Sequence, residues 1–435
     1  MSMTTRRRVI GGLACGVAAG ALPSLWPRRA AAQDDAALTQ RLAADLARHA
    51  GFGDKFSGGP GDLATADWVA ERLRGLRYDV AESTFEAPFF VKRAARLAAG
   101  AAASDVIPQA PGAPTGTRGV TAPLALVEDA VGDVRGRIAL VVAPFARHAA
   151  LFPDRGIGKT VVAVAEAGAA AVVIVTTGPS GEAVALNSPE EGPFVPVPTA
   201  VLAPKSSAPF VAAARAGAEA TLVLDGEATH RPSKNVVARL RRGSRWLAIS
   251  TPRSGWFGCV GERGTGTAAF LALAEWAPRR FPDLSVFVMN TGGHEYFFAG
   301  SHRVLHEAPP PSDTPVWVHI GATLAARDVV QHDGRLVMLD TADASRTLMT
   351  TEAARAAVTE AFEGLSGLAQ PVAVRPKAGE LSAFTDLGYT KAFAVIGQHT
   401  WFHTPLDTLA CVDARLLTPV VRAHQRAIEL LLAAR

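Results

Sequence analysis

The 435-residue sequence has only three cysteines and, beyond residue 33, no long run of apolar residues. A membrane-spanning helix needs about 20 apolar residues, so no span is expected in this part of the chain. Charge of one sign is also scarce, because residues 1–33 hold five arginines and the remainder carries 39 basic against 40 acidic residues. This balance disfavours a nucleic-acid-binding protein, and the 49% hydrophobic content excludes a disordered chain.

Residues 1–33 have the organisation of an export signal. Arg6, Arg7 and Arg8 precede an apolar stretch over 9–26, and the small residues 30–32 form a cleavage site. Paired arginines favour the twin-arginine route, with a general secretory signal, a retained anchor or a lipoprotein at Cys15 as alternatives. We therefore expect an exported protein, periplasmic or extracellular.

The rest of the chain divides into residues 34–120, which end in an Ala-, Gly- and Pro-rich linker at 95–120, a separate unit at 121–229, and residues 230–435. Apolar spacing predicts helices at 36–50, 63–76, 160–168, 208–216, 266–278, 351–364 and 419–434. Strands are predicted at 78–85, 138–143, 170–176, 199–203, 220–224, 236–240, 246–250, 285–290, 316–319 and 392–396. This alternation predicts an α/β fold with a mostly parallel sheet flanked by helices.

Reactive side chains follow four of the predicted strands in the third segment. They are Arg253, Glu262, His294, Glu295, His319, His399 and His403. Ligands of open α/β sheets bind beyond the carboxyl ends of the strands, so we expect a site here. Carboxylates and imidazoles are zinc ligands, and a neighbouring His or Glu moves protons.

These segments resemble the secreted di-zinc aminopeptidase family of α/β exopeptidases, to which glutaminyl cyclases and glutamate carboxypeptidases are related. The resemblance runs from Ser57-Gly58-Gly59-Pro60-Gly61 to the His403-Thr404-Pro405 segment that ends at Thr408. Residues 132–141 and 165–174 resemble the protease-associated domain, a common insertion in secreted peptidases. The resemblance implies a phosphorylase/hydrolase-like zinc exopeptidase fold with an inserted α/β domain.

The family's catalytic pattern is altered in this chain. Its His-x-Asp-Ser segment reads Thr251-Pro252-Arg253-Ser254, its Asp-Asp-Gly-Ser-Gly reads Glu262-Arg263-Gly264-Thr265-Gly266, and its Glu-Glu pair reads His294-Glu295. No Asp follows the strand that ends at 319–321, whereas the last ligand is retained as His403. The resemblance then implies one zinc on Glu262, Glu295 and His403. His294 would be the base, and Arg253 would replace the missing zinc as electrophile or as a carboxylate clamp.

Several alternatives remain open for these residues. Glu262 can pair with Arg253 or Arg263 in a site without metal, or His319 can replace a lost ligand of a second zinc. A Ser254 or Cys259 nucleophile with His294 and Glu295 would need no metal. Cys259 and Cys411 form either a disulfide or two buried thiols.

Aromatic residues crowd the same loops, and Trp256, Tyr296 and Trp401 are predicted to line a substrate pocket together with Glu380. His399 is interpreted as structural. The sequence thus favours an exported aminopeptidase-like metallohydrolase with one zinc that acts on a peptide or small amide. The alternatives are a catalytically inactive homologue that binds a peptide or small ligand, and a metal-independent hydrolase. No oligomeric state is predicted.

Overall fold

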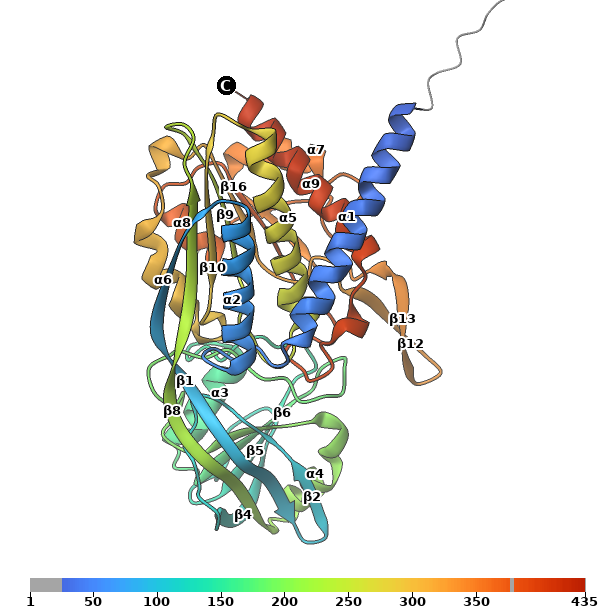
Figure 1. Ribbon diagram of the computed structural model, residues 1–435. Helices are drawn as coiled ribbons and strands as arrows, with labels where there is room; N and C mark the ends of the chain where they lie inside the picture. The colour runs from blue at the N-terminus through green and yellow to red at the C-terminus, as the bar shows by residue number, and fades with distance from the viewer. Residues whose placement is uncertain (1–25, 376–378, 435) are drawn as a thin grey trace, which may run out of the picture.

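The computed structural model describes residues 26–375 and 379–434, which form a large mixed sheet with helices on both faces (Figure 1). Its strands follow the order β15-β14-β16-β11-β9-β10-β8-β4-β5-β6-β7-β3, with β1 on β8 and β2 on β1. The strands are β1 (79–99), β2 (102–105), β3 (107–108), β4 (120–127), β5 (138–143), β6 (171–176), β7 (199–202), β8 (219–240), β9 (246–252), β10 (285–291), β11 (316–320), β14 (347–350), β15 (372–373) and β16 (392–396). The helices are α1 (26–51), α2 (60–75), α3 (156–166), α4 (208–215), α5 (265–280), α6 (299–304), α7 (355–361), α8 (380–386) and α9 (414–433). The predicted α/β fold is confirmed.

Two long antiparallel strands, β1 and β8, run side by side from one end of the molecule to the other (Figure 1). The strands predicted at 220–224 and 236–240 are parts of the single strand β8, so the expected domain boundary at residue 229 falls within it. The linker predicted at 95–120 is wrong for its first half, which contains the end of β1 and the strands β2 and β3, whereas residues 109–119 are irregular. Pairing with neighbouring strands overrides the weak strand propensity of its alanines.

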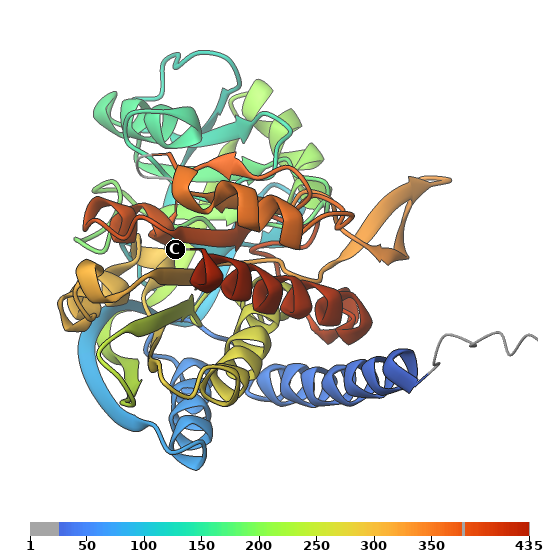
Figure 2. The same cartoon turned by 90° about the horizontal axis from the view of Figure 1, so that it is seen from above.

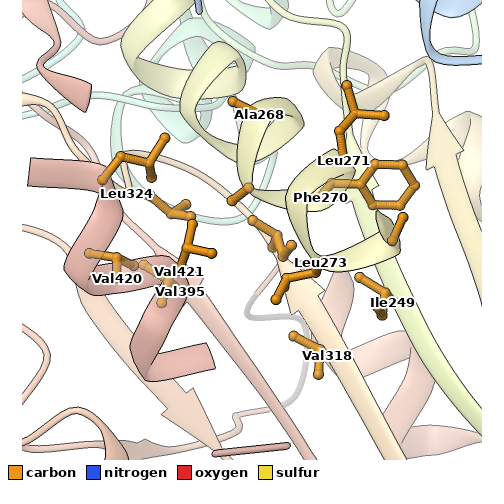
Figure 3. Packing of buried hydrophobic residues seen from close by; sticks show 14 of the residues in the cluster. Ile249, Ala268, Phe270, Leu271, Leu273, Val318, Leu324, Val395, Val420 and Val421 are labelled. Carbon is orange, nitrogen blue, oxygen red and sulfur yellow. The ribbon is translucent and has the colours of Figure 1, made fainter. Parts of the chain in front are cut away.

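The central strands β16, β11, β9 and β10 are parallel to one another, and alternate side chains separate the two faces of the sheet. Leu247 and Ile249 face the cluster covered by α1, α2, α5, α7 and α9, whereas Trp246 and Ala248 face the cluster of α6 and α8. Figure 3 shows the first cluster, in which Leu273 of α5 packs among strand residues. Burial of each large aliphatic side chain stabilises the fold by about 1.5–3 kcal/mol.

The second unit repeats this arrangement with the strands β4, β5, β6 and β7. These four strands are parallel to one another, and β6 is buried over its whole length, as expected for a strand covered on both faces. Helix α3 packs Val161 and Val164 on one face, and α4 packs Phe210 and Ala214 on the other.

The elements not expected from the sequence are the strands β2, β3, β4, β14 and β15, the helices α6 and α8, and a hairpin of β12 (327–332) and β13 (335–342), which projects from the body in Figure 2. The helix predicted at 351–364 is shorter, since a 3₁₀ turn at 352–354 precedes α7. In the described part of the chain, no helix is both long enough and apolar enough to cross a membrane. Most of the predicted export signal lies outside the described residues.

Candidate functional site

The carboxyl ends of four adjacent parallel strands gather the predicted site residues at one edge of the sheet. Arg253 follows β9, His294 and Glu295 follow β10, Gly321 follows β11, and His403 follows β16. A one-turn π-helix at 260–264 opens α5 and carries Glu262 into the same region. Sequence and topology therefore agree on where the site lies, and the side-chain contacts decide what it is.

The guanidinium of Arg263 lies at the centre of this gathering and is fully buried. Its Nε donates to the carbonyl of Ser254 at 3.2 Å, and Nη1 donates to the carbonyl of Gly321 at 2.7 Å. Its Nη2 forms an ion pair with Glu262 Oε1 at 2.7 Å. Arg263 thus links the ends of β9 and β11 to the start of α5, in the region where the sequence predicts a metal.

Of the three predicted zinc ligands, Glu262 and His403 are in contact with each other. His403 donates from Nδ1 to the carbonyl of Ala185, and its Nε2 lies 3.2 Å from Glu262 Oε1. Burial acts to raise the pKa of Glu262, but the charges of Arg263 and His403 hold it below its ordinary value. The carboxylate is therefore compensated by side chains of the protein itself.

Glu295, the third predicted ligand, is engaged elsewhere. Its Oε1 accepts from the backbone N–H of Ser57 and its Oε2 accepts from the Ser254 hydroxyl, both at 2.7 Å. Although Glu262 Oε2 lacks a hydrogen-bond partner within the described ranges, Glu262 and His403 alone are fewer than the three protein ligands of a catalytic zinc site. No cluster of three His, Cys, Asp or Glu side chains suited to a metal occurs among residues 26–375 and 379–434. The donor set does not fit zinc.

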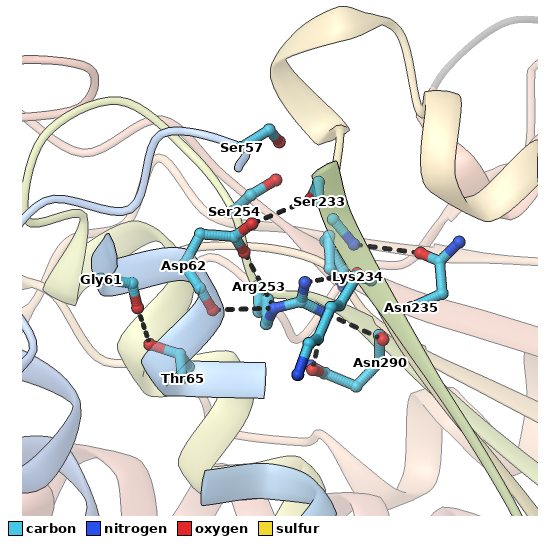
Figure 4. Close-up of polar contacts among 12 residues, drawn as sticks. Ser57, Gly61, Asp62, Thr65, Ser233, Lys234, Asn235, Arg253, Ser254 and Asn290 are labelled. Atoms are coloured by element: carbon cyan, nitrogen blue, oxygen red, sulfur yellow. Dashed lines mark hydrogen bonds and ion pairs between the residues drawn. The ribbon is translucent and has the colours of Figure 1, made fainter. Parts of the chain in front are cut away.

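Arg253 was predicted as the electrophile, and the structure contradicts this role. It is completely buried and forms an ion pair with Asp62 of α2 at 2.9 Å, as Figure 4 shows. It also donates to the backbone carbonyls of Asp62, Lys234 and Asn290 and to the side-chain oxygen of Asn290. Asp62 also accepts from Ser233, so the guanidinium is committed to holding β8, β9, β10 and α2 together. Asp62 was missed because nothing in the sequence pairs it with residue 253.

The nucleophile alternatives are also not supported by the contacts. Ser254 donates to Glu295, and the His294 ring turns away from Ser254 to Glu380. Cys259 and Cys411 are buried free thiols, not a disulfide, and burial raises the pKa of both. Each thiol is therefore protonated and poorly nucleophilic near neutral pH.

A cavity of about 910 Å³ opens beside Arg263. Its polar floor contains Glu380, whose Oε1 lies 3.2 Å from His294 Nδ1 and whose Oε2 lies 3.6 Å from His319 Nε2. Burial raises the pKa of Glu380 to about 8, although Arg263 opposes the shift. Burial and Arg263 together lower the pKa of His319 to about 3 and hold that of His294 well below its usual range. Glu380, which the sequence predicts in a substrate pocket, is among the residues that line this cavity.

The apolar walls of the cavity are phenylalanines and not the aromatic residues predicted. Trp256 and Tyr296 are buried against each other and Trp401 packs on the core, whereas the lining contains Phe152, Phe297, Phe298 and Phe402. Phe152 comes from the second unit and stacks on Phe297, with ring centroids 5.3 Å apart. The prediction failed because the turn after β10 buries Tyr296 and directs the next two residues into the cavity.

Phe297 and Phe298 have φ angles of 45° and 69°. This left-handed conformation costs an aromatic residue about 1–3 kcal/mol and persists only where the surroundings impose it.

His399 bonds Asp407 at 3.2 Å and lies away from the cavity, in agreement with a structural role. The sequence indicates Arg263 only as a partner of Glu262, although its place in the altered Glu262-Arg263-Gly264 segment is a signal for its role.

The buried Arg253–Asp62 pair predicts a large effect of Asp62→Asn on stability. Loss of the carboxylate leaves Arg253 buried without an opposite charge, which costs about 3–5 kcal/mol. We expect a urea titration to show this loss. The control Asp67→Asn changes another residue of α2 and removes its exposed ion pair with Lys234 of β8. It should lower the free energy of unfolding by less than about 1 kcal/mol. Equal effects of the two substitutions would contradict the interpretation.

Glu380 predicts a pH-dependent difference between the wild type and Glu380→Gln. The carboxyl titrates near its ordinary value of 4.5 when unfolded and near 8 when folded, so the folded state binds more protons between these values. Wild-type stability then falls with rising pH across this window, by at most ~1.4 kcal/mol per pH unit, and the variant lacks this loss. In urea unfolding at pH 5, 6.5 and 8, the free energy of unfolding of the variant should rise relative to that of the wild type as the pH rises. Parallel stability curves would refute the assignment.

The fold is that of known zinc aminopeptidases. A zinc aminopeptidase from Bacillus subtilis superposes with a TM-score of 0.68 at 16% identity over 90% of this chain and 94% of its own. The peptidase M28 precursor from Shewanella amazonensis superposes with a TM-score of 0.66 at 15% identity, over 93% of this chain and 97% of its own. An aminopeptidase from Aneurinibacillus superposes with a TM-score of 0.61 at 18% identity, over 91% of this chain and 95% of its own. No family model and no curated protein matches the sequence. The expected resemblance is thus confirmed at the level of the fold, and the protease-associated identity of residues 121–229 stays a prediction.

Proposed function

We propose that this protein is a metal-independent binding protein that holds a peptide or small ligand in the cavity beside Arg263. The observation that carries the proposal is the Arg263 guanidinium, which contacts Glu262 and two strand-end carbonyls in the region where zinc was expected. The alternative of a catalytically inactive homologue therefore replaces the single-zinc hydrolase as the favoured interpretation.

A guanidinium and a zinc ion satisfy the same carboxylate in different ways. Zinc accepts electron pairs from its ligands and activates a bound water molecule, whereas Arg263 carries a fixed charge and donates hydrogen bonds. With Glu295 also bonded to Ser57 and Ser254, both acidic residues are held by groups of the protein itself. The cavity floor beside them recognises a ligand without a cofactor.

The cavity itself supports binding. Its volume of about 910 Å³ lies within the range of ligand pockets, and it combines apolar walls with a few convergent polar groups. Phe297 and Phe298 face the cavity in costly backbone conformations. A cavity that served no purpose would gain stability by relaxing these residues and collapsing.

A metal-independent hydrolase is the second candidate. Glu380 and His294 form a part-buried carboxyl–imidazole pair in the cavity, and a perturbed pair of this kind is suited to proton transfer. The peptidase fold adds weight to this candidate. A hydrolase would release the two halves of a peptide or amide substrate. Detection of these products therefore distinguishes a hydrolase from a binding protein.

The predicted export signal and the second unit are both consistent with a binding protein. An exported binding protein would meet its ligand in the periplasm or outside the cell. Residues 121–229, as a protease-associated-like unit, would supply Phe152 and neighbouring residues as one wall. The backbone of this unit bonds that of His403 and Glu295 through Ala185 and Ser188, which fixes the wall on the site.

The proposal predicts that the mature protein purified without chelator contains far less than one zinc per chain by elemental mass spectrometry. Added zinc or EDTA should leave the melting temperature unchanged, whereas an ion at 1,000 times its Kd would stabilise the fold by about 4 kcal/mol. One zinc per chain, lost in both Glu295→Ala and His403→Ala, would overturn the metal-independent proposal.

A cavity-filling variant tests binding directly. We expect Ala383→Phe, on the cavity side of α8, to abolish the thermal shifts that a library of peptides and small amides produces with the wild type. Leu387→Phe, at an exposed position next to this helix, should keep them. Peptide-bond cleavage by the wild type that disappears in Ala383→Phe and Glu380→Gln would favour the hydrolase instead.

A further inference from the structure

In the polar floor of the cavity, the Arg263 guanidinium has more N–H groups than assigned partners. A guanidinium has five N–H groups, and Arg263 uses three of them on Ser254, Gly321 and Glu262. Two N–H groups therefore have no assigned partner among the described residues, on a side chain that lines the cavity. Its charge also acts on Glu380 and both floor histidines.

The hydrogen bonds of Ser250 add a further donor. The Trp317 indole N–H donates to the Ser250 hydroxyl at 2.9 Å, and this hydroxyl lies 2.9 Å from His319 Nδ1. All three groups are satisfied when Ser250 donates its own proton to Nδ1, which makes Nε2 the protonated nitrogen of a neutral His319. This Nε2 lies 3.6 Å from Glu380 Oε2, which is too far for a hydrogen bond, and that buried oxygen has no hydrogen-bond partner in the described part of the chain.

Glu380 completes the donor set. A carboxyl group that keeps its proton near neutral pH is itself a donor, and burial has this effect on Glu380. A cationic amine would meet the field of Arg263 and would have to remove this proton first. A carboxylate would instead accept from the acid, from His319 and from Arg263, since charge-assisted hydrogen bonds of this type are the strongest available.

The walls and the mouth indicate the rest of the ligand. Phe152, Phe297, Phe298 and Phe402 present apolar surface above the floor, and Arg155 at the rim lies 3.9 Å from the Phe152 ring centroid. From the floor and the walls we infer that the cavity binds a carboxylic acid that carries an apolar or aromatic group. This inference rests on the proposed binding function. The carboxylate lies on the floor at Arg263 and His319, and the apolar group lies against the phenylalanines. A free small acid and the C-terminus of a peptide share this chemistry.

Isothermal titration of the full chain at pH 7 tests this inference with four probes. They are N-acetylphenylalanine, its carboxamide, phenethylamine, and an N-acetylated Ala-Ala-Phe peptide with a free carboxylate. We expect the first acid to bind at least tenfold more tightly than its carboxamide, and the amine to bind more weakly than both. The peptide distinguishes the sources, because binding as tight as that of the small acid identifies a peptide C-terminus and much weaker binding identifies a free acid.

Variants control for the position of the site and for folding. Ala383→Phe should abolish acid binding, Leu387→Phe should keep it, and melting curves of each verify that the protein is folded. Glu380→Gln keeps a donor and should retain the preference for acid over carboxamide within about threefold. Binding of the amine that disappears in this variant would show Glu380 acting as an anionic acceptor and would overturn the inference.

The remaining outcomes separate this inference from the proposed function. Equal affinities for the acid and the carboxamide, or cavity binding of other library compounds with none of the acids, overturn the carboxylate and leave the binding function standing. Absence of binding by every compound in both experiments overturns both.

Discussion

The buried ion pair of Arg263 and Glu262 is the interaction on which the rest of the site depends. Transfer of two charges from water is costly, and removal of one partner of such a pair typically destabilises a protein by about 3–5 kcal/mol. Arg263 meets this cost through bonds to two strand-end carbonyls in addition to Glu262. The same charge acts on the acid and the histidines of the cavity floor, so one side chain sets both the local structure and the electrostatics.

A fold shared with zinc aminopeptidases does not require their chemistry. The parallel strands still deliver polar side chains to one edge of the sheet, because that follows from the topology alone. Arg263 and the hydrogen bonds of Glu295 change what those side chains can do. The second unit closes the cavity with Phe152, so the character of the site depends on both halves of the chain.

Much of the fold was predictable because its signals are local. Strands such as β5 and β16 are continuous apolar runs, and their predicted bounds agree with the structure. The errors occurred where a partner distant in sequence decides the outcome. The segment at 95–120 has little strand propensity, yet residues 95–99, 102–105 and 107–108 form strands because they pair with β8, with each other and with β7.

The sequence by itself determined the α/β architecture and the set of residues at the strand ends, since both follow from the spacing of apolar residues along the chain. It also contained both arginines and both of their acidic partners. Only the tertiary structure decided that Arg253 pairs with Asp62 of α2 and that Arg263 also bonds the carbonyls of Ser254 and Gly321. The physical reason is that an ion pair depends on a few ångströms between side chains from separate elements, and no local pattern encodes that distance.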